Sequence, residues 1–255
     1  MRLRSMITLC ALAMAAGASA QTEFEQSRGS GWYLGYDPAG NVSFAVTGTI
    51  DYEMPVAATG GLKALDDLLV TSAGLQKAED GTVVFNYLPG DNYKPTDETT
   101  FSQTLATVKP KTAYKVDAQI KKVAETPHYI SMKATSYTKS LASDGYDIGT
   151  VEYVNYNKDT DAVIDYFDVF NASAERRLRE MMYPVARKKY PLTIGSSDEM
   201  ELVENFAITP EGVTFCFPES SIAPASAGCP EISLTWKQLR GGNCLADGIE
   251  ERIGK

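Results

Sequence analysis

Hydrophobic residues alternate with polar ones along much of the chain, and this two-residue period predicts β-strands. Strands are predicted over residues 31–36, 42–50, 82–88, 114–123, 128–138, 148–156, 162–167, 206–208, 213–217 and 232–236. Turn residues separate neighbouring strands. Between residues 206–208 and 213–217, Pro210 presets φ and Gly212 accepts a positive φ, which predicts a hairpin.

Two segments have helical spacing instead. Leu62, Leu65, Leu68 and Leu69 predict a helix over residues 62–71. A longer helix is predicted over residues 174–189, and its apolar stripe consists of Leu178, Met181, Met182, Val185 and Ala186. Ser173 is expected to cap this helix, and Pro184 is expected to kink it. The change between the two periods predicts an α+β fold: antiparallel β-sheets with one or two helices packed on one face.

Residues 1–20 have the pattern of a secretory signal peptide. Arg2 and Arg4 precede the apolar run 6–16, and the small residues 18–20 fit a cleavage site. We read Cys10 as part of the apolar run, because the bulky Leu9 precedes it. No later segment approaches the roughly 20 apolar residues that a membrane span needs. The mature chain, from residue 21, is therefore predicted to be periplasmic or secreted.

The net charge of the chain restricts the classes of partner that suit it. With 24 basic and 33 acidic residues the formal net charge is −9, and removing Arg2 and Arg4 makes it −11. An acidic chain does not suit nucleic acid. It suits a basic partner by long-range attraction, although acidity also serves solubility alone.

Three cysteines remain after the signal peptide: Cys216, Cys229 and Cys244. In an oxidising compartment an odd number predicts one disulfide and one free thiol, with three possible pairings. We favour Cys229 with Cys244, because both lie near Pro or Gly in predicted loops. The only histidine, His128, is not near them in sequence, so neither a zinc site nor a catalytic thiol is predicted, and no cofactor is expected.

One acidic segment partly matches a calcium-binding loop. Asn157, Asp159, Asp161, Asp165 and Asp168 occupy positions 1, 3, 5, 9 and 12 of a calcium-loop template. Ala162 stands at position 6, where the sharp turn needs glycine, and a strand is predicted before the loop where the template has a helix. A polar turn is therefore favoured over a metal site.

One short motif matches a catalytic pattern. Ser136 and Lys139 match the Ser-x-x-Lys motif of some acyl enzymes, but that motif opens a helix in those enzymes, whereas it ends a predicted strand here. We expect a protein that is not an enzyme.

Several segments together resemble a known family. ISMKATSY (130–137) is similar to its central strand, and YNKDTD (156–161) with DVF (168–170) is similar to a second motif. FCF (215–217) followed by IAPASAG (222–228) completes the pattern. The chain over roughly residues 111–240 thus resembles the RsiV-like extracellular domain, found in a lysozyme-sensing anti-sigma factor and in PdaC-type peptidoglycan deacetylases. The family's glycine-rich loop with histidine is replaced by KSLASDGY (139–146), and its aromatic residue after the IAP motif is Ala225.

The resemblance implies a domain organisation and a role. We expect a signal peptide (1–20), an N-terminal β-rich region (21–108), an RsiV-like C-terminal domain (109–245) and a tail (246–255), with the boundary in the polar loop 89–95. The implied role is a non-catalytic cell-envelope binding module that binds or inhibits a lysozyme-like hydrolase, or binds peptidoglycan. The alternatives are an envelope hydrolase with carboxylate catalysts that the sequence does not identify, or a calcium-stabilised structural domain.

The expected contact surface lies on two loops. Residues 139–149 stand where the family has its glycine-rich loop, and residues 222–228 form the second family-marked segment outside the strands. Loops held by a rigid sheet are where binding residues collect. We predict that both lie on one side of the sheet and that Asp144, Tyr146, Asp147 and Glu219 touch the partner, because Tyr gives rigid contact area and carboxylates steer a basic protein.

Overall fold

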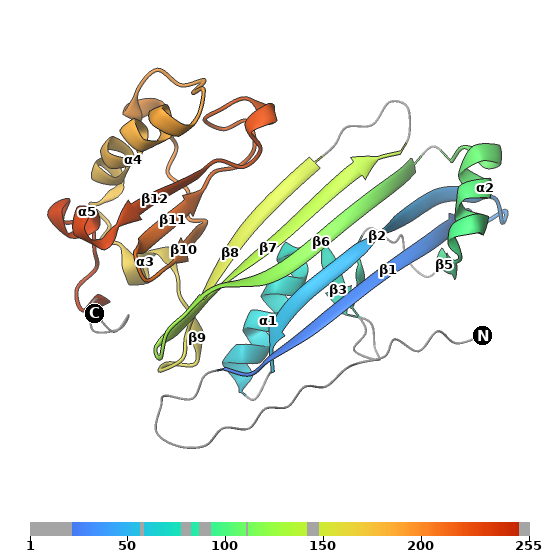
Figure 1. Cartoon of the computed structure of the whole chain (residues 1–255), viewed down its shortest axis with the longest axis horizontal. Coiled ribbons are helices and arrows are strands. Elements are labelled where there is room, and N and C mark those ends of the chain that lie inside the picture. Colours follow the sequence, from blue (N-terminus) through green and yellow to red (C-terminus); the bar gives the residue numbers. More distant parts are fainter. Residues whose placement is uncertain are drawn as a thin grey trace.

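The computed structural model describes residues 22–56, 59–77, 83–86, 93–110, 112–141 and 148–249. Its largest element is a seven-stranded sheet with the order β5-β1-β2-β6-β7-β8-β9 (Figure 1). The strands are β1 (Phe24–Tyr36), β2 (Val42–Pro55), β5 (Tyr93–Thr96), β6 (Thr112–Glu125), β7 (Tyr129–Ser140), β8 (Ile148–Asn157) and β9 (Ala162–Val163). A small hairpin, β3 (Leu75–Lys77) with β4 (Val83–Phe85), lies outside this sheet. The predicted signal peptide lies outside the described residues.

Antiparallel pairing dominates the large sheet, and one pair departs from it. β2 and β6 run parallel, with Gly48 opposite Val116. A Cβ at Gly48 would lie 1.7 Å from the carbonyl oxygen of Val116, so only glycine permits this approach. Because β2 pairs with β6, the sheet takes strands from both sides of residue 108. Residues 93–95, predicted as part of a polar loop, belong to the edge strand β5.

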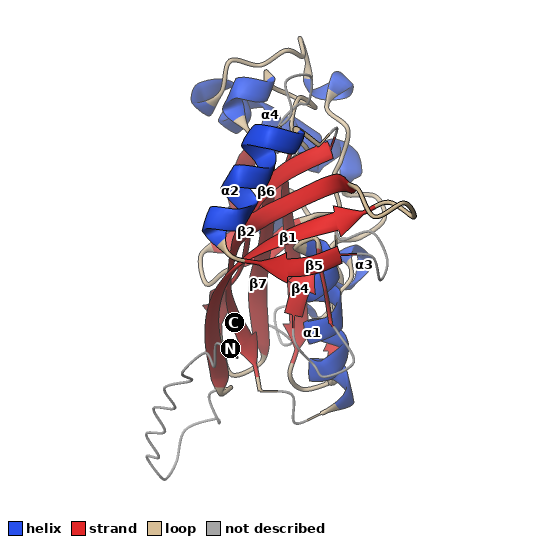
Figure 2. Ribbon diagram, turned by 90° about the vertical axis from the view of Figure 1, so that its right-hand side faces the viewer, coloured by secondary structure: helices blue, strands red, loops and turns tan. Residues whose placement is uncertain are grey.

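Helices cover both faces of this sheet (Figure 2). α1 (Gly60–Ser72) begins at Thr59, whose side chain accepts a hydrogen bond from the N–H of Leu62. Its leucines pack with Val116, Ile130 and Met132 in one core cluster. α2 (Glu98–Val108) covers the other face beside β1 and β2, where Phe101 is buried against Leu34, Ala45 and Ala113. The predicted α+β fold is confirmed, and α2 is an element that the hydrophobic pattern did not predict.

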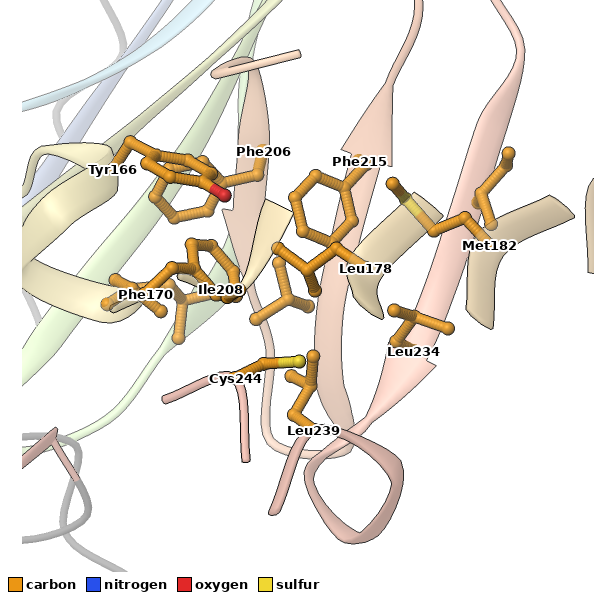
Figure 3. Close-up of a cluster of buried hydrophobic side chains, with 14 of the residues drawn as sticks. Tyr166, Phe170, Leu178, Met182, Phe206, Ile208, Phe215, Leu234, Leu239 and Cys244 are labelled. Atoms are coloured by element: carbon orange, nitrogen blue, oxygen red, sulfur yellow. The ribbon is translucent and has the colours of Figure 1, made fainter. Parts of the chain in front are cut away.

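The C-terminal part of the chain forms a second layer. β10 (Phe206–Ile208), β11 (Gly212–Cys216) and β12 (Glu231–Thr235) make a three-stranded antiparallel sheet. Beside it lie α3 (Tyr166–Val169), α4 (Glu175–Lys189), α5 (Trp236–Gly241) and the short 3₁₀ turns Ser197–Glu199 and Ala225–Ala227. Their shared core includes Tyr166, Phe170, Leu178, Met182, Phe206, Phe215, Leu234 and Leu239 (Figure 3). This unit is called the C-terminal unit below.

α4 forms largely as predicted. Leu178, Met182 and Ala186 have no exposed surface, which confirms the centre of the stripe, and Pro184 lies inside the helix. The predicted cap at Ser173 is wrong, because the N-cap residue is Ala174 and the Ser173 hydroxyl donates to Asn171 Oδ1 at 2.8 Å. The predicted last strand also ends one residue early. Trp236 begins α5, and Thr235 and Gln238 form a capping box at its start.

Candidate functional site

The last residue of the first predicted loop, at one end of β8, lies close to two residues that flank the second predicted segment, 222–228. Asp144, Tyr146 and Asp147 lie outside the described residues, but Gly149 at the end of that loop is described. A Cβ at Gly149 would lie 3.7 Å from the Tyr137 ring and 3.9 Å from the Glu219 carboxylate. The Cys229 thiol lies 3.9 Å from the Gly149 carbonyl oxygen. We call Tyr137, Gly149, Glu219 and Cys229 the Glu219 corner.

Exposure differs within the corner. The Tyr137 side chain projects from β7 on the face away from α1 and is 47% exposed, while Glu219 and Cys229 are half-buried. Tyr137 was not among the predicted contact residues. The alternation of β7 provided the signal, because the apolar residues Ile130, Met132 and Ala134 define one face of the strand and the odd-numbered Tyr137 falls on the other.

The predicted segment 222–228 is divided between the core and the surface. Ile222 and Ala223 are 1% and 0% exposed, and Ile222 packs in the core of the C-terminal unit. Residues 224–226 are exposed. The apolar start of the segment is therefore scaffold, and only its later residues are open to a partner.

A polar network lies next to the corner and joins the two sheets. Lys133 Nζ of β7 lies 2.6 Å from Glu231 Oε1 of β12, and the Tyr153 hydroxyl donates to the same oxygen at 2.8 Å. Burial alone would raise the pKa of Glu231, but the hydrogen bonds from Lys133 and Tyr153 outweigh it and leave this pKa below its ordinary value. Burial and the Glu231 carboxylate both raise the pKa of Tyr153. The network therefore joins β7, β8 and β12 at Glu231, two residues after Cys229 in the chain.

The three cysteines are free thiols, so the predicted Cys229–Cys244 disulfide is wrong. Cys229 precedes β12 and lies at the corner, whereas Cys244 follows α5 and lies in the core beside Leu239 (Figure 3). The length of β12 and α5 separates them. Cys216, opposite Glu231 in the β11–β12 pair, is buried, and this burial raises the pKa of its thiol to about 12.

The five calcium candidates have separate partners. Asn157 Oδ1 accepts the backbone N–H groups of Asp159 and Thr160 in the turn, and the Asp159 carboxylate contacts His128 Nδ1 at 2.8 Å. Asp165 and Asp168 form the capping box of α3. Within the described residues, no group of three or more metal-binding side chains comes together.

The fifth candidate, Asp161, has a structural role at α1. Its carboxylate accepts hydrogen bonds from the hydroxyls of Thr59 and Tyr156 and from the N–H of Gly61. These bonds lower the pKa of Asp161. A carboxylate at a helix N-terminus stabilises the helix, so Asp161 anchors α1 to the turn after β8.

The candidate catalytic residues do not meet. Ser136 and Lys139 are an odd number of positions apart on β7, so their side chains point to opposite faces of the sheet. His128 precedes β7, whereas Cys229 lies near the far end of this strand, roughly 30 Å away at about 3.3 Å per residue.

Among the described residues, no helix is both long and apolar enough to cross a membrane.

Comparisons with known proteins identify relatives of unknown function. Residues 158–237, which include α3, α4 and the small sheet, match the family described as "Protein of unknown function (DUF3298)". No curated protein matches the chain. A solved DUF3298 family protein from Pseudomonas aeruginosa PAO1 is 15% identical, covers 91% of this chain and 97% of its own, and has a TM-score of 0.55. A DUF3298 family member from Bacteroides fragilis NCTC 9343 is 13% identical, with coverage of 93% and 99% and a TM-score of 0.60. At these identities the likeness shows a shared fold.

Proposed function

We propose that this chain is a non-catalytic cell-envelope binding module that contacts a basic, lysozyme-like hydrolase at the Glu219 corner. The observation that carries the proposal is that the exposed Tyr137 ring and the half-buried Glu219 carboxylate both lie within 4 Å of the position that a Cβ at Gly149 would take. A rigid aromatic side chain supplies contact area, and a carboxylate adds charge complementarity. The resemblance to RsiV-like extracellular domains supports this choice of partner, and peptidoglycan is the second candidate ligand.

Two further properties support binding at this place. The formal net charge of −9 attracts a basic protein over distances of about a Debye length, roughly 10 Å at 0.1 M salt. The Lys133–Glu231–Tyr153 network also holds β7, β8 and β12 together next to the corner. A surface held in place before contact loses less conformational entropy on binding.

The proposal is tested by measuring binding of a basic lysozyme to the mature protein by calorimetry, at low and at high salt. Tyr137→Ala and Glu219→Gln are expected to weaken binding about tenfold each, or ~1.4 kcal/mol. Phe167→Ala is the control for the aromatic change, because Phe167 is 66% exposed on α3. Glu175→Gln on α4 is the control for the charge.

Each outcome has a separate meaning. An absence of binding by the wild type at low salt would exclude the lysozyme as partner, and the same protein would then be tested for co-sedimentation with insoluble peptidoglycan. Equal losses in the corner variants and the controls would exclude the corner. Release of soluble fragments from peptidoglycan would favour the alternative of an envelope hydrolase.

A further inference from the structure

A surface groove runs between α4 and α5 of the C-terminal unit. It has two lobes, of about 530 and 580 Å³, which share Glu180, Met181, Gly241 and Gly242 and are therefore continuous. Both volumes fall in the range of about 300–1,000 Å³ that is typical of ligand pockets. Figure 1 shows α5 on the side of this unit that faces away from the large sheet. The groove is thus a different surface from the Glu219 corner.

The two lobes differ in chemistry. The first adds Arg176, Arg177 and Asn243 to the shared residues. The second adds Pro184, Val185, Lys188 and Gln238. One end of the groove is therefore cationic, and the other end combines an apolar wall with a single lysine.

The charge of α4 contrasts with the charge of the whole chain. The helix carries six basic and two acidic residues, a formal charge of +4, whereas the chain has −9. Two ion pairs, Arg176–Glu180 and Arg179–Glu175, lie within the helix at 3.3 and 3.5 Å. The Arg176–Glu180 pair is exposed and such pairs are weak, about 0.3–0.5 kcal/mol, so a ligand carboxylate competes for Arg176 at little cost.

Arg177 is already positioned at the cationic lobe. Its Nη1 donates to the carbonyl oxygens of Gly242 and Asn243, at 3.1 and 3.3 Å, which fixes the guanidinium across the groove. Among the described residues it has no other hydrogen-bond partner, which leaves Nε and Nη2 for a ligand. A guanidinium held in this way suits the two oxygens of a carboxylate.

The groove floor is open because two glycines form it. A Cβ at Gly241 meets no atom within 4 Å, so a side chain there would project into free space. A Cβ at Gly242 would lie 3.0 Å from the Met181 methyl group and 3.1 Å from the Cys244 sulfur. Glycine at position 242 therefore permits the close approach of Met181, and position 241, which lines both lobes, can accept a larger side chain.

We propose that the α4–α5 groove binds an acidic peptide segment of a partner protein. Carboxylates of the segment pair with Arg176 and Arg177, and an apolar side chain a few residues away contacts Met181, Pro184 and Val185. The proposal does not rest on the lysozyme proposal, because it concerns another surface and a ligand of the opposite charge.

The test uses the mature protein and a fluorescein-labelled peptide, Leu-Ala-Glu-Glu-Glu, followed by fluorescence anisotropy. Arg176→Glu and Gly241→Trp are expected to weaken binding about tenfold or more, because one reverses the rim charge and the other fills the floor. Arg187→Glu is the matched control: it makes the same charge change on the exposed part of α4, outside the groove lining, and is expected to change the affinity less than about twofold. Thermal melts verify that each variant folds.

Lys188→Glu on the rim of the second lobe replaces Gly241→Trp if the tryptophan variant does not fold. Two further peptides test the chemistry. Leu-Ala-Lys-Lys-Lys is expected not to bind, and Ser-Ala-Glu-Glu-Glu is expected to bind more weakly than the leucine peptide. Equal losses for Arg176→Glu and Arg187→Glu would reduce the effect to general charge attraction and overturn the proposal. Unchanged binding in Gly241→Trp would also overturn it.

Discussion

The side chain of Asn155, on β8, hydrogen-bonds to the backbone at Ile208, on β10, in the way that the backbone of a neighbouring strand would. Its Oδ1 accepts the N–H of Ile208 at 2.9 Å, and its Nδ2 donates to the carbonyl oxygen of Phe206 at 2.7 Å. The side chain is 2% exposed, so both bonds are made away from water. Ser131 of β7 adds a hydroxyl that bonds to Asn155 and Ile208. The side-chain amide of Asn155, in the large sheet, therefore supplies hydrogen-bond partners to the backbone of β10, in the small sheet.

Replacing Asn155 should loosen the C-terminal unit from the large sheet. In Asn155→Ala the Phe206 carbonyl loses its Asn155 partner and the Ile208 N–H keeps only the longer bond to Ser131, at 3.2 Å. A buried polar group without a partner costs about 1–3 kcal/mol, so we expect a loss of roughly 2–3 kcal/mol in a denaturant melt. The control is Asn41→Ala in an exposed turn, with an expected change within about 0.5 kcal/mol. Equal effects of the two changes would refute the bridging role of Asn155.

Glu125 should make stability depend on pH. Its carboxylate lies 2.6 Å from Lys158 Nζ and 2.9 Å from Lys122 Nζ, and accepts the N–H of Thr22. Burial would raise the pKa of Glu125, but these three donors outweigh it and lower the pKa from 4.5 to about 2. Because the folded-state pKa is depressed, the stabilisation is present above about pH 4.5 and is lost as the pH falls toward 2.

The measurement compares unfolding free energies of the wild type and Glu125→Gln between pH 3 and 7. We expect Glu125→Gln to lose about 1–2 kcal/mol at pH 7 and much less at pH 3, since the lysines stay partly in water. Glu25→Gln, at an exposed position on β1, is the control. A difference between wild type and Glu125→Gln that does not shrink with falling pH would contradict the assignment.

The helix stripe of α4 should behave as core. Leu178 and Met182 have no exposed surface and pack with Phe215 and Leu234 of the small sheet (Figure 3). Leu178→Ala or Met182→Ala is expected to cost about 2–5 kcal/mol in a denaturant melt, because each leaves a cavity. Arg187→Ala on the exposed side of the same helix should change stability by less than about 0.5 kcal/mol. A loss under half a kcal/mol for the leucine would contradict this packing.

Local patterns predicted the elements that bury a continuous stripe, and failed where the stripe is short. α4 was found because three of its residues are fully buried at helical spacing, whereas α2 buries only Phe101 and has no such signal. α5 had a different local signal, because Thr235 and Gln238 have the spacing of a capping box. The alternation through Trp236 nevertheless led to the prediction of a strand. The parallel pairing of β2 with β6 had no local signal, because it joins residues about 70 positions apart.

The candidate site was predictable only in part, for a similar reason. Glu219 lies near Gly149, the last residue of the predicted loop, whereas Asp144, Tyr146 and Asp147 lie outside the described residues, so the predicted contact surface stays a prediction. Tyr137 could have been added from the alternation of β7. The α4–α5 groove could not have been predicted, because its floor at Gly241 and Gly242 becomes a surface only when α5 packs beside α4. The positive charge of α4 could be read from the sequence, but the position of these basic residues beside a groove could not.

The thiols should react in an order set by burial. Cys216 is buried, with the pKa of its thiol raised to about 12, and Cys244 is buried in the core, where burial also raises its pKa. Of the three cysteines that the structure describes, only Cys229 is partly exposed, although burial raises the pKa of its thiol as well. Because the thiolate is the reactive form and must be reached by the reagent, we expect an aromatic disulfide reagent to label Cys229 first and the other two only on unfolding. Peptide mapping of the labelled native protein identifies the site, with Cys229→Ser as the control that should remove the fast phase. Fast labelling of Cys244, or a Cys229–Cys244 link in native protein treated with oxidised glutathione, would contradict the burial of Cys244 beside Leu239 and restore the pairing that the sequence first favoured.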